Sequence, residues 1–204
     1  EPTPPLTAEP GTSPLKGRVV IVGSGPAGGF AAYVLALNGY RPLLIERGKP
    51  ALERLRQIGR WNAGVVELDP ESNALFGEGG AGSFSDGKLY TRSGKRGDIQ
   101  AVLETLVAYG ASRDILIDAH PHIGTNKLPE IVTAMREAIE AAGGEVRFGT
   151  RVNDFLITDG RIHGVRTAQG DEVLATSVVL ATGHSARDIF ELLHTKGIAI
   201  EAKS

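Results

Sequence analysis

The 204-residue sequence contains no cysteine, one tryptophan and one methionine, and its formal net charge is only −2. Without cysteine there are no disulfides, thiolate metal sites or dithiol redox centres, so any redox reaction needs a bound cofactor. A net charge this close to zero gives no indication of nucleic-acid binding. No apolar run reaches transmembrane length, and no signal-peptide pattern opens the chain. We therefore expect a cytoplasmic protein with neither nucleic-acid nor membrane partners.

The five histidines show no H-x-x-x-H spacing, and we predict no metal site. Glycine, by contrast, is abundant, with 27 residues, and four of them fall between Gly77 and Gly82. These clusters stand next to apolar segments rather than within a serine-rich linker. Glycine in such places indicates backbone that approaches a ligand closely.

The first 17 residues contain five prolines and show no periodicity, so they are predicted to be a flexible linker. The chain begins with Glu1, and we expect it to be a piece of a longer protein. From residue 18 to residue 204 the pattern is that of one α/β domain. Strands are expected at residues 18–22, 41–45, 146–148, 152–158, 161–167, 171–175 and 177–180, and helices at 26–38, 52–58, 99–109, 129–142 and 185–194.

Local signals support several of these elements. Pro26 suits the first turn of a helix, and Asp98 suits the N-cap of another. Asp159-Gly160 predicts a two-residue hairpin turn in a β-meander. Ser185, with Asp188 three residues later, resembles a capping box for the last helix.

The sequence Gly23-Ser24-Gly25-Pro26-Ala27-Gly28 fits G-x-G-x-x-G between a strand and a helix. Gly23 permits a tight turn, Gly25 admits a pyrophosphate, and Gly28 allows close helix packing. The N–H groups of the helix start attract an anion. Glu46 ends the next strand, where it would accept hydrogen bonds from ribose hydroxyls and repel a 2′-phosphate, an effect that Arg47 softens. The turn is predicted to bind a dinucleotide.

The order of elements distinguishes FAD from NAD. A plain NAD-binding unit continues with βα repeats, whereas here a β-meander is followed by a strand ending in Ala181-Thr182-Gly183. This order is similar to the two-dinucleotide-binding flavoprotein superfamily. The resemblance implies a Rossmann-like parallel sheet with helices and a meander crossover, Val152 near the adenine, and the Ala181–Gly183 turn near the flavin nucleotide.

The second glycine cluster, in FGEGGAGSFSDGKL, looks like the flavin-facing loop of the uncharacterised FAD-dependent dehydrogenase family, as do PHIGTNKL and ATGHSARDIFELL. The resemblance implies FAD with its isoalloxazine near residues 79–88. Within that range Lys88 would stabilise the reduced flavin. The other cofactor-binding candidates there are Gly79, Gly80, Gly82, Ser83 and Ser85.

The same loop also fits the P-loop pattern G-x-x-x-x-G-K, but Leu89 stands where Ser or Thr would bind magnesium, and no strand is expected just before it. Lys88 and His184 are weak catalytic candidates. His120 and His122 are expected to be loop residues rather than substrate ligands.

The resemblance also implies what is missing. Flavoproteins of this type have a late Gly-Asp strand and a substrate domain, and nothing after Gly183 matches either. We therefore expect the FAD-binding portion of a flavin-dependent oxidoreductase, acting on a small-molecule substrate and with NAD(P)H as a candidate partner. The alternative is a dinucleotide-binding module, for NAD or FAD, that acts as a sensor or partner-binding domain without turnover.

Overall fold

The computed structural model describes residues 17–85, 87–89, 97–118, 120–124 and 127–202. Apart from Gly17, the predicted linker lies outside the described residues. The described chain is built around a four-stranded parallel sheet in the order β3 (Glu145–Arg147), β2 (Leu43–Ile45), β1 (Val19–Val22) and β7 (Ser177–Leu180). β1 and β2 are buried on both faces, because layers cover the sheet on each side.

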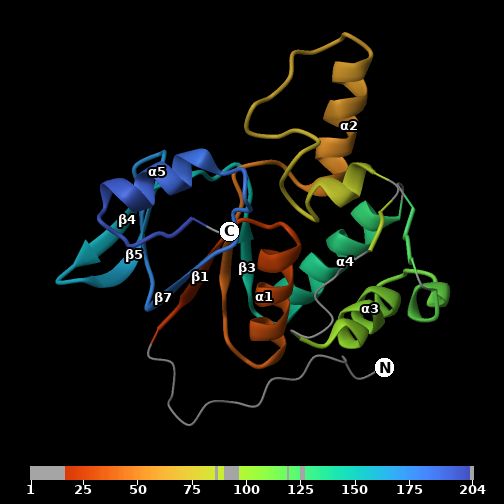
Figure 1. Cartoon of the computed structure of the whole chain (residues 1–204), viewed down its shortest axis with the longest axis horizontal. Helices are drawn as coiled ribbons and strands as arrows, with labels where there is room; N and C mark the ends of the chain where they lie inside the picture. The colour runs from red at the N-terminus through yellow and green to blue at the C-terminus, as the bar shows by residue number, and fades with distance from the viewer. Residues whose placement is uncertain (1–16, 86, 90–96, 119, 125–126, 203–204) are drawn as a thin grey trace.

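Helices cover one face of this sheet (Figure 1). They are α1 (Pro26–Leu37), α3 (Ile99–Ala108) and α4 (Leu128–Ala141). Ile21 and Leu44 point into this layer, where they join a core with Ile131 and Ile139 of α4. Asp98 caps α3 by accepting a hydrogen bond from the Ala101 amide at 3.0 Å, which confirms the predicted cap.

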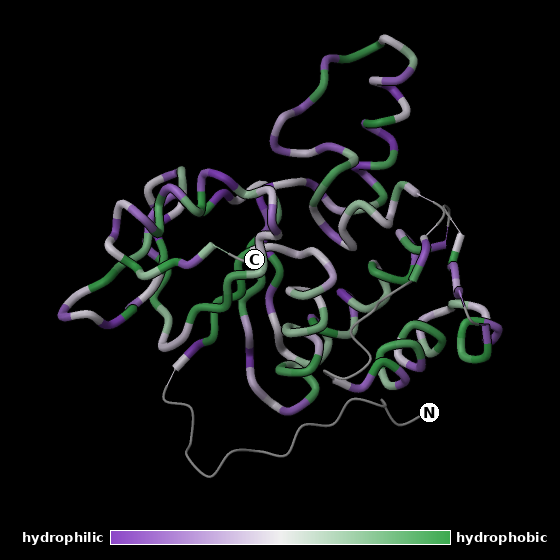
Figure 2. Tube along the Cα trace, viewed as in Figure 1, coloured by the Kyte–Doolittle hydropathy of each residue, from purple (hydrophilic) through white to green (hydrophobic). Residues whose placement is uncertain are grey.

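An antiparallel meander covers the other face (Figure 1). It consists of β4 (Val152–Thr158), β5 (Arg161–Thr167) and β6 (Glu172–Leu174). Val20 and Ile45 point into this second core, beside Phe155 and Val165. The hydrophobic colouring of the central strands in Figure 2 reflects this two-sided burial. The predicted Asp159-Gly160 turn is confirmed, with φ of +52° and +69° at its two residues.

Two α-helices and two short 3₁₀ helices complete the described part of the chain. α2 (Ala51–Asn62) projects from the sheet in Figure 1 and leads into the second glycine loop. That loop contains a short 3₁₀ helix, η1 (Ala81–Phe84), and a second, η2 (Arg113–Leu116), follows α3. α5 (Arg187–Thr195) ends the described fold beside the meander.

The predicted α/β class, with a parallel sheet and a meander, is confirmed. Strands β4, β5 and β7 have the predicted bounds, and the helices differ by a few residues at their ends. The predicted capping box of α5 is wrong, because its N-cap is Ala186 and Asp188 pairs with arginines instead.

Candidate functional site

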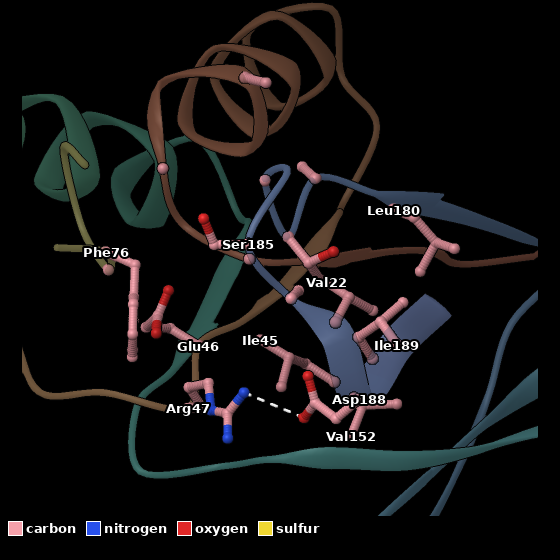
Figure 3. A pocket seen from close by; sticks show the side chains of 18 of the residues that line it. Val22, Ile45, Glu46, Arg47, Phe76, Val152, Leu180, Ser185, Asp188 and Ile189 are labelled. Atoms are coloured by element: carbon pink, nitrogen blue, oxygen red, sulfur yellow. Dashed lines mark hydrogen bonds and ion pairs between the residues drawn. The ribbon is translucent and has the colours of Figure 1, made fainter. Parts of the chain in front are cut away.

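A cavity of about 600 Å³ lies at the carboxyl ends of β1, β2 and β7 (Figure 3). The chain leaves β1 for β2 on one side and returns as β7 on the other, so this edge is a topological switch point of the sheet. Ligands of open α/β sheets bind at such points. Val22, Ile45 and Leu180, the last residues of the three strands, line the cavity.

The three motif glycines occupy physically different places. A Cβ on Gly28 would lie 1.8 Å from the Gly23 carbonyl oxygen, and one on Gly23, whose φ is +100°, would lie 2.5 Å from the Ala181 oxygen. Gly25 lines the cavity, and a Cβ there would meet nothing within 4 Å among the described residues. Gly23 and Gly28 therefore serve packing, whereas Gly25 leaves open space beside the first turn of α1.

That first turn is suited to an anion. Gly25 is the N-cap of α1, and among the described residues no side chain caps the helix. The unpaired N–H groups of a helix start carry about half a positive charge. A phosphate in the cavity beside Gly25 would meet them. The residues present therefore fit the pyrophosphate of a dinucleotide.

Glu46, at the end of β2, is almost completely buried, with 3% exposure, yet lines the cavity. Its Oε2 accepts hydrogen bonds from the Ser24 amide at 2.9 Å and the Ser24 hydroxyl at 2.6 Å, and Oε1 accepts one from the Gly48 amide at 2.8 Å. A carboxylate has about four acceptor positions. Glu46 thus fixes the first glycine turn and keeps capacity for a ribose hydroxyl.

An ion-pair network lies at one side of the cavity, connecting β2, β4, α5 and the loop after α2. Arg47 donates to Glu71 at 2.5 Å and to Asp188 at 3.0 Å (Figure 3 shows the second pair). Arg151 reaches the same two carboxylates at 3.4 and 3.1 Å. The hydrogen bond from Arg47 lowers the pKa of Glu71, and that to Glu71 raises the pKa of Arg47. The two arginines are therefore held by carboxylates.

A second cavity, of about 350 Å³, lies between α1, α4 and the second glycine loop. It shares Gly25, Pro26 and Gly80 with the first cavity. Its walls are largely apolar, with Lys88 and Arg136 among its charged residues. Residues 87–89 pair antiparallel with 121–123, through the Leu89 amide to the Pro121 carbonyl and the Ile123 amide to the Gly87 carbonyl.

Most of the predicted cofactor residues line one of these cavities. The first is lined by Gly23, Gly25, Pro26, Ala27, Glu46, Arg47, Gly80, Val152, Ala181, Thr182 and Gly183, together with His184. The second adds Gly79, Gly82 and Lys88.

The structure places three predicted residues away from the cavity walls. Gly28 is buried behind the first glycine turn. Ser83 is buried, and its hydroxyl donates to the Glu78 carbonyl at 3.2 Å. The Ser85 hydroxyl donates to the Gly82 carbonyl and accepts from the Gly87 amide.

Other residues of the site were not predicted. Phe76, Arg151, Ser185 and Ile189 line the first cavity. Arg151 could have been found, because it directly precedes Val152 at the start of β4. Phe76 offers no such signal, because its place depends on the path of a long loop.

The P-loop alternative finds no support in the described geometry, because Gly82 lies within η1 rather than after a strand. Within the described parts of the chain, no three His, Cys, Asp or Glu side chains are grouped as a metal site. None of the described helices combines the length and apolar character needed to cross a bilayer.

Residues 119–203 match the DAO family, described as FAD dependent oxidoreductase. The match confirms the predicted resemblance to FAD-dependent oxidoreductases and the prediction of FAD as the cofactor. It includes the whole meander, β7 and α5.

The chain is also similar in sequence to several curated proteins. The chain is 40% identical over 195 residues to an uncharacterized protein of Clostridium beijerinckii, covering 95% of this chain and 36% of that protein. It is 30% identical to protein FixC of Escherichia coli K12, covering 80% of this chain and 36% of that protein. It is 26% identical to a digeranylgeranylglycerophospholipid reductase of Haloferax volcanii, covering 82% of this chain and 36% of that protein. The chain thus spans about a third of the length of these relatives.

Among solved structures, THI4 of Thermovibrio ammonificans has the same fold, with a TM-score of 0.56 and 24% identity, covering 90% of this chain and 64% of that one.

Proposed function

We propose that this chain is the FAD-binding portion of a flavin-dependent oxidoreductase, in which hydride passes between an organic substrate and flavin N5. The observation that carries the proposal is the bare Cα of Gly25, which lines a cavity of about 600 Å³ beside the uncapped first turn of α1. NAD(P)H is a candidate electron donor to the same cofactor, and a cytoplasmic location fits a protein that lacks cysteine.

FAD, when bound, supplies a ring that accepts or donates a hydride. The chain's own residues then have three tasks. The Gly23–Gly28 turn would hold the pyrophosphate, Glu46 would accept from a ribose hydroxyl, and Val152, which lines the first cavity, would contact the adenine. The Ala181–Gly183 turn lies directly beside Gly23, and both line the first cavity.

The flavin end of the proposed site is the second glycine loop. Gly79, Gly80 and Gly82 form a wall of the second cavity, which also includes Lys88. A cation beside the ring would favour the anionic reduced flavin. His184 lines the first cavity and is exposed, so it is available to a substrate or to the cofactor.

The experiment that tests the proposal is a fluorescence titration of FAD against the wild-type chain and Gly25→Val. We expect the wild type to bind FAD and the variant to lose at least about tenfold in affinity, because the valine side chain occupies the space of the phosphate. Gly59→Val in α2 is the matched control, since a Cβ there also meets nothing within 4 Å and the position lies outside both cavities.

The redox part of the proposal has its own measurement. An FAD-loaded chain should bleach with dithionite and regain its absorbance in air. If Gly25→Val binds FAD as well as the wild type does, the proposed position of the phosphate beside Gly25 is wrong. Binding of NAD without any binding of FAD would instead favour the non-catalytic dinucleotide module.

A further inference from the structure

Arg54 is the most deeply buried charged residue of the described chain, with 0% exposure, although it lies in the helix that projects from the fold. Its guanidinium does not reach solvent. It donates to three backbone carbonyls of the second glycine loop: Nη1 to Phe76, and Nη2 to Glu78 at 2.7 Å and to Gly80 at 3.5 Å. One side chain therefore binds the carbonyl of every second residue of the loop from Phe76 to Gly80.

The loop is shaped around this guanidinium. Gly77, Gly79 and Gly80 have φ of +105°, +74° and +71°, which side chains rarely tolerate. A Cβ on Gly77 would lie 1.8 Å from Arg54 Nη1. On another side the Phe84 ring lies against the guanidinium, 4.5 Å from its centroid to Cζ. The contacts enclose the charge on the loop side.

A hydrogen-bonded path leads from Arg54 to the first glycine turn. The peptide between Glu78 and Gly79 accepts from Arg54 through its carbonyl, and its N–H donates to the Ser24 carbonyl at 3.1 Å. Ser24 in turn donates to Glu46 through its amide and hydroxyl. The path thus joins Arg54 to the carboxylate that lines the first cavity.

Two buried carboxylates, Glu46 and Glu78, act electrostatically on this buried charge. The Glu78 carboxylate accepts from the Ala51 amide at 2.7 Å, at the start of α2, and from Arg136 Nε at 2.9 Å. Burial lowers the pKa of Arg54 to about 10, while Glu46 and Glu78 oppose this shift. Arg54 therefore keeps its charge at neutral pH.

We infer that Arg54 is a positioning residue that holds the second glycine loop against the first glycine turn and thereby sets the wall that the two cavities share. On the loop side this shared wall is Gly80, whose Cβ, if present, would lie 2.9 Å from the Pro26 ring on the opposite side. The consequence for cofactor affinity rests on the proposed function; the positioning of the loop does not.

Lysine cannot replace the guanidinium at such a site, because an ammonium on a flexible stem does not present the planar fork that reaches several carbonyls at once. Hydrogen exchange followed by mass spectrometry, on the chain without FAD, is the first measurement. In Arg54→Lys the amides of residues 77–84 should exchange at least about tenfold faster, while those of α4 keep their wild-type rates. Arg56→Lys, an exposed arginine of the same helix, is the control.

A second variant covers the outcome in which Arg54→Lys does not fold. Phe84→Leu keeps an apolar side chain but removes the ring from the guanidinium, and it should also speed exchange of residues 77–84. Wild-type exchange of this loop in a folded variant of either kind would overturn the inference.

The effect of each variant on FAD affinity is measured by FAD titrations below the melting temperature of that variant. A loss of about tenfold in FAD affinity, matching faster loop exchange, supports the inference. Faster loop exchange with wild-type FAD affinity would show that Arg54 holds the loop without setting the cofactor site, and it would overturn that part of the inference. If the wild type binds no FAD, the proposed function fails, and the loop exchange still decides whether Arg54 holds the loop.

Discussion

At the scale of single residues, the G-x-G-x-x-G motif combines two kinds of glycine that one pattern does not distinguish. Gly28 and Gly23 are glycines because backbone lies where a Cβ would be. Gly25 faces open space in the cavity, so the packing of the described residues does not require its missing side chain, which under the proposed function leaves room for the phosphate. Substitutions at these positions should therefore separate stability from binding.

Gly28→Ala should lower stability. Its Cβ would lie 1.8 Å from the Gly23 carbonyl oxygen and 3.2 Å from the Ala181 Cβ, so α1 must move away from β1. We expect a loss of about 1–3 kcal/mol in the free energy of unfolding, as for other overpacked sites, measured by urea denaturation. Gly29→Ala is the control in the same helix, because its nearest neighbour is 3.9 Å away. Equal stability of the two variants would contradict this account of Gly28.

Glu46→Gln should also lower stability, although the motif suggests only a role in ribose binding. Oε2 accepts from both the amide and the hydroxyl of Ser24, so an amide nitrogen in its place, or in that of Oε1, leaves a buried donor unpaired. The expected cost is about 1–3 kcal/mol by urea denaturation. Glu53→Gln, at an exposed site on α2, should change stability by less than about 0.5 kcal/mol. A Glu46→Gln variant as stable as that control would limit Glu46 to ligand binding.

Some site residues could be predicted from the sequence because their surroundings are formed by neighbouring residues, whereas others have surroundings formed by distant segments. Gly25 and Glu46 follow their strands at fixed spacings, so a local pattern finds them. Arg54 has the sequence context of an ordinary charged residue on an amphipathic helix. Its burial depends on the loop at residues 76–84 folding back over it, which no local pattern encodes.

At the scale of elements, α5 shows how tertiary charge pairing overrides a local signal. Ser185 and Asp188 have the spacing of a capping box, yet Asp188 pairs with Arg47, just after β2, and Arg151, just before β4. Two guanidiniums are stronger partners for a carboxylate than a single amide is. The helix is thereby attached to the rim of the first cavity.

The other end of α5 is attached to the meander, and this contact should depend on pH. Lys196 Nζ lies 2.7 Å from Asp154 Oδ1, and this hydrogen bond is the main cause of the lowered pKa of Asp154. A lowered pKa stabilises the fold above the unfolded value of about 3.9 and loses that effect as pH falls through the folded value. Lys196→Met should therefore cost about 0.2–1 kcal/mol at pH 7 and less at pH 3, by urea denaturation.

The control for this pair is the same substitution in an Asp154→Asn background. There the cost of Lys196→Met should be small at both pH values, because the carboxylate that titrates is gone. A cost that stays constant from pH 7 to pH 3 in the wild-type background would mean that Lys196 acts through packing of its stem instead.

At the scale of the whole molecule, the two cavities of the proposed site are formed by different parts of the three-layered fold. The first cavity is formed at the ends of sheet strands, which two cores hold rigidly. The second depends on the glycine loop, α1 and α4. The order of strands, meander and Ala181–Gly183 was predictable because each is a local pattern, whereas the size and separation of the two cavities follow from packing between layers.

This difference predicts how parts of FAD should protect the chain against heat. At 100 times its dissociation constant a ligand stabilises a protein by about 2.7 kcal/mol, which is about 5–10 °C in Tm for a chain of this length. We expect FAD to give the largest shift, ADP to retain much of it through the phosphate turn and Glu46, and FMN to give little at the same concentration. Differential scanning fluorimetry with Gly25→Val as the control measures all three. A larger shift with FMN than with ADP would place the main binding energy at the glycine loop rather than at the sheet edge.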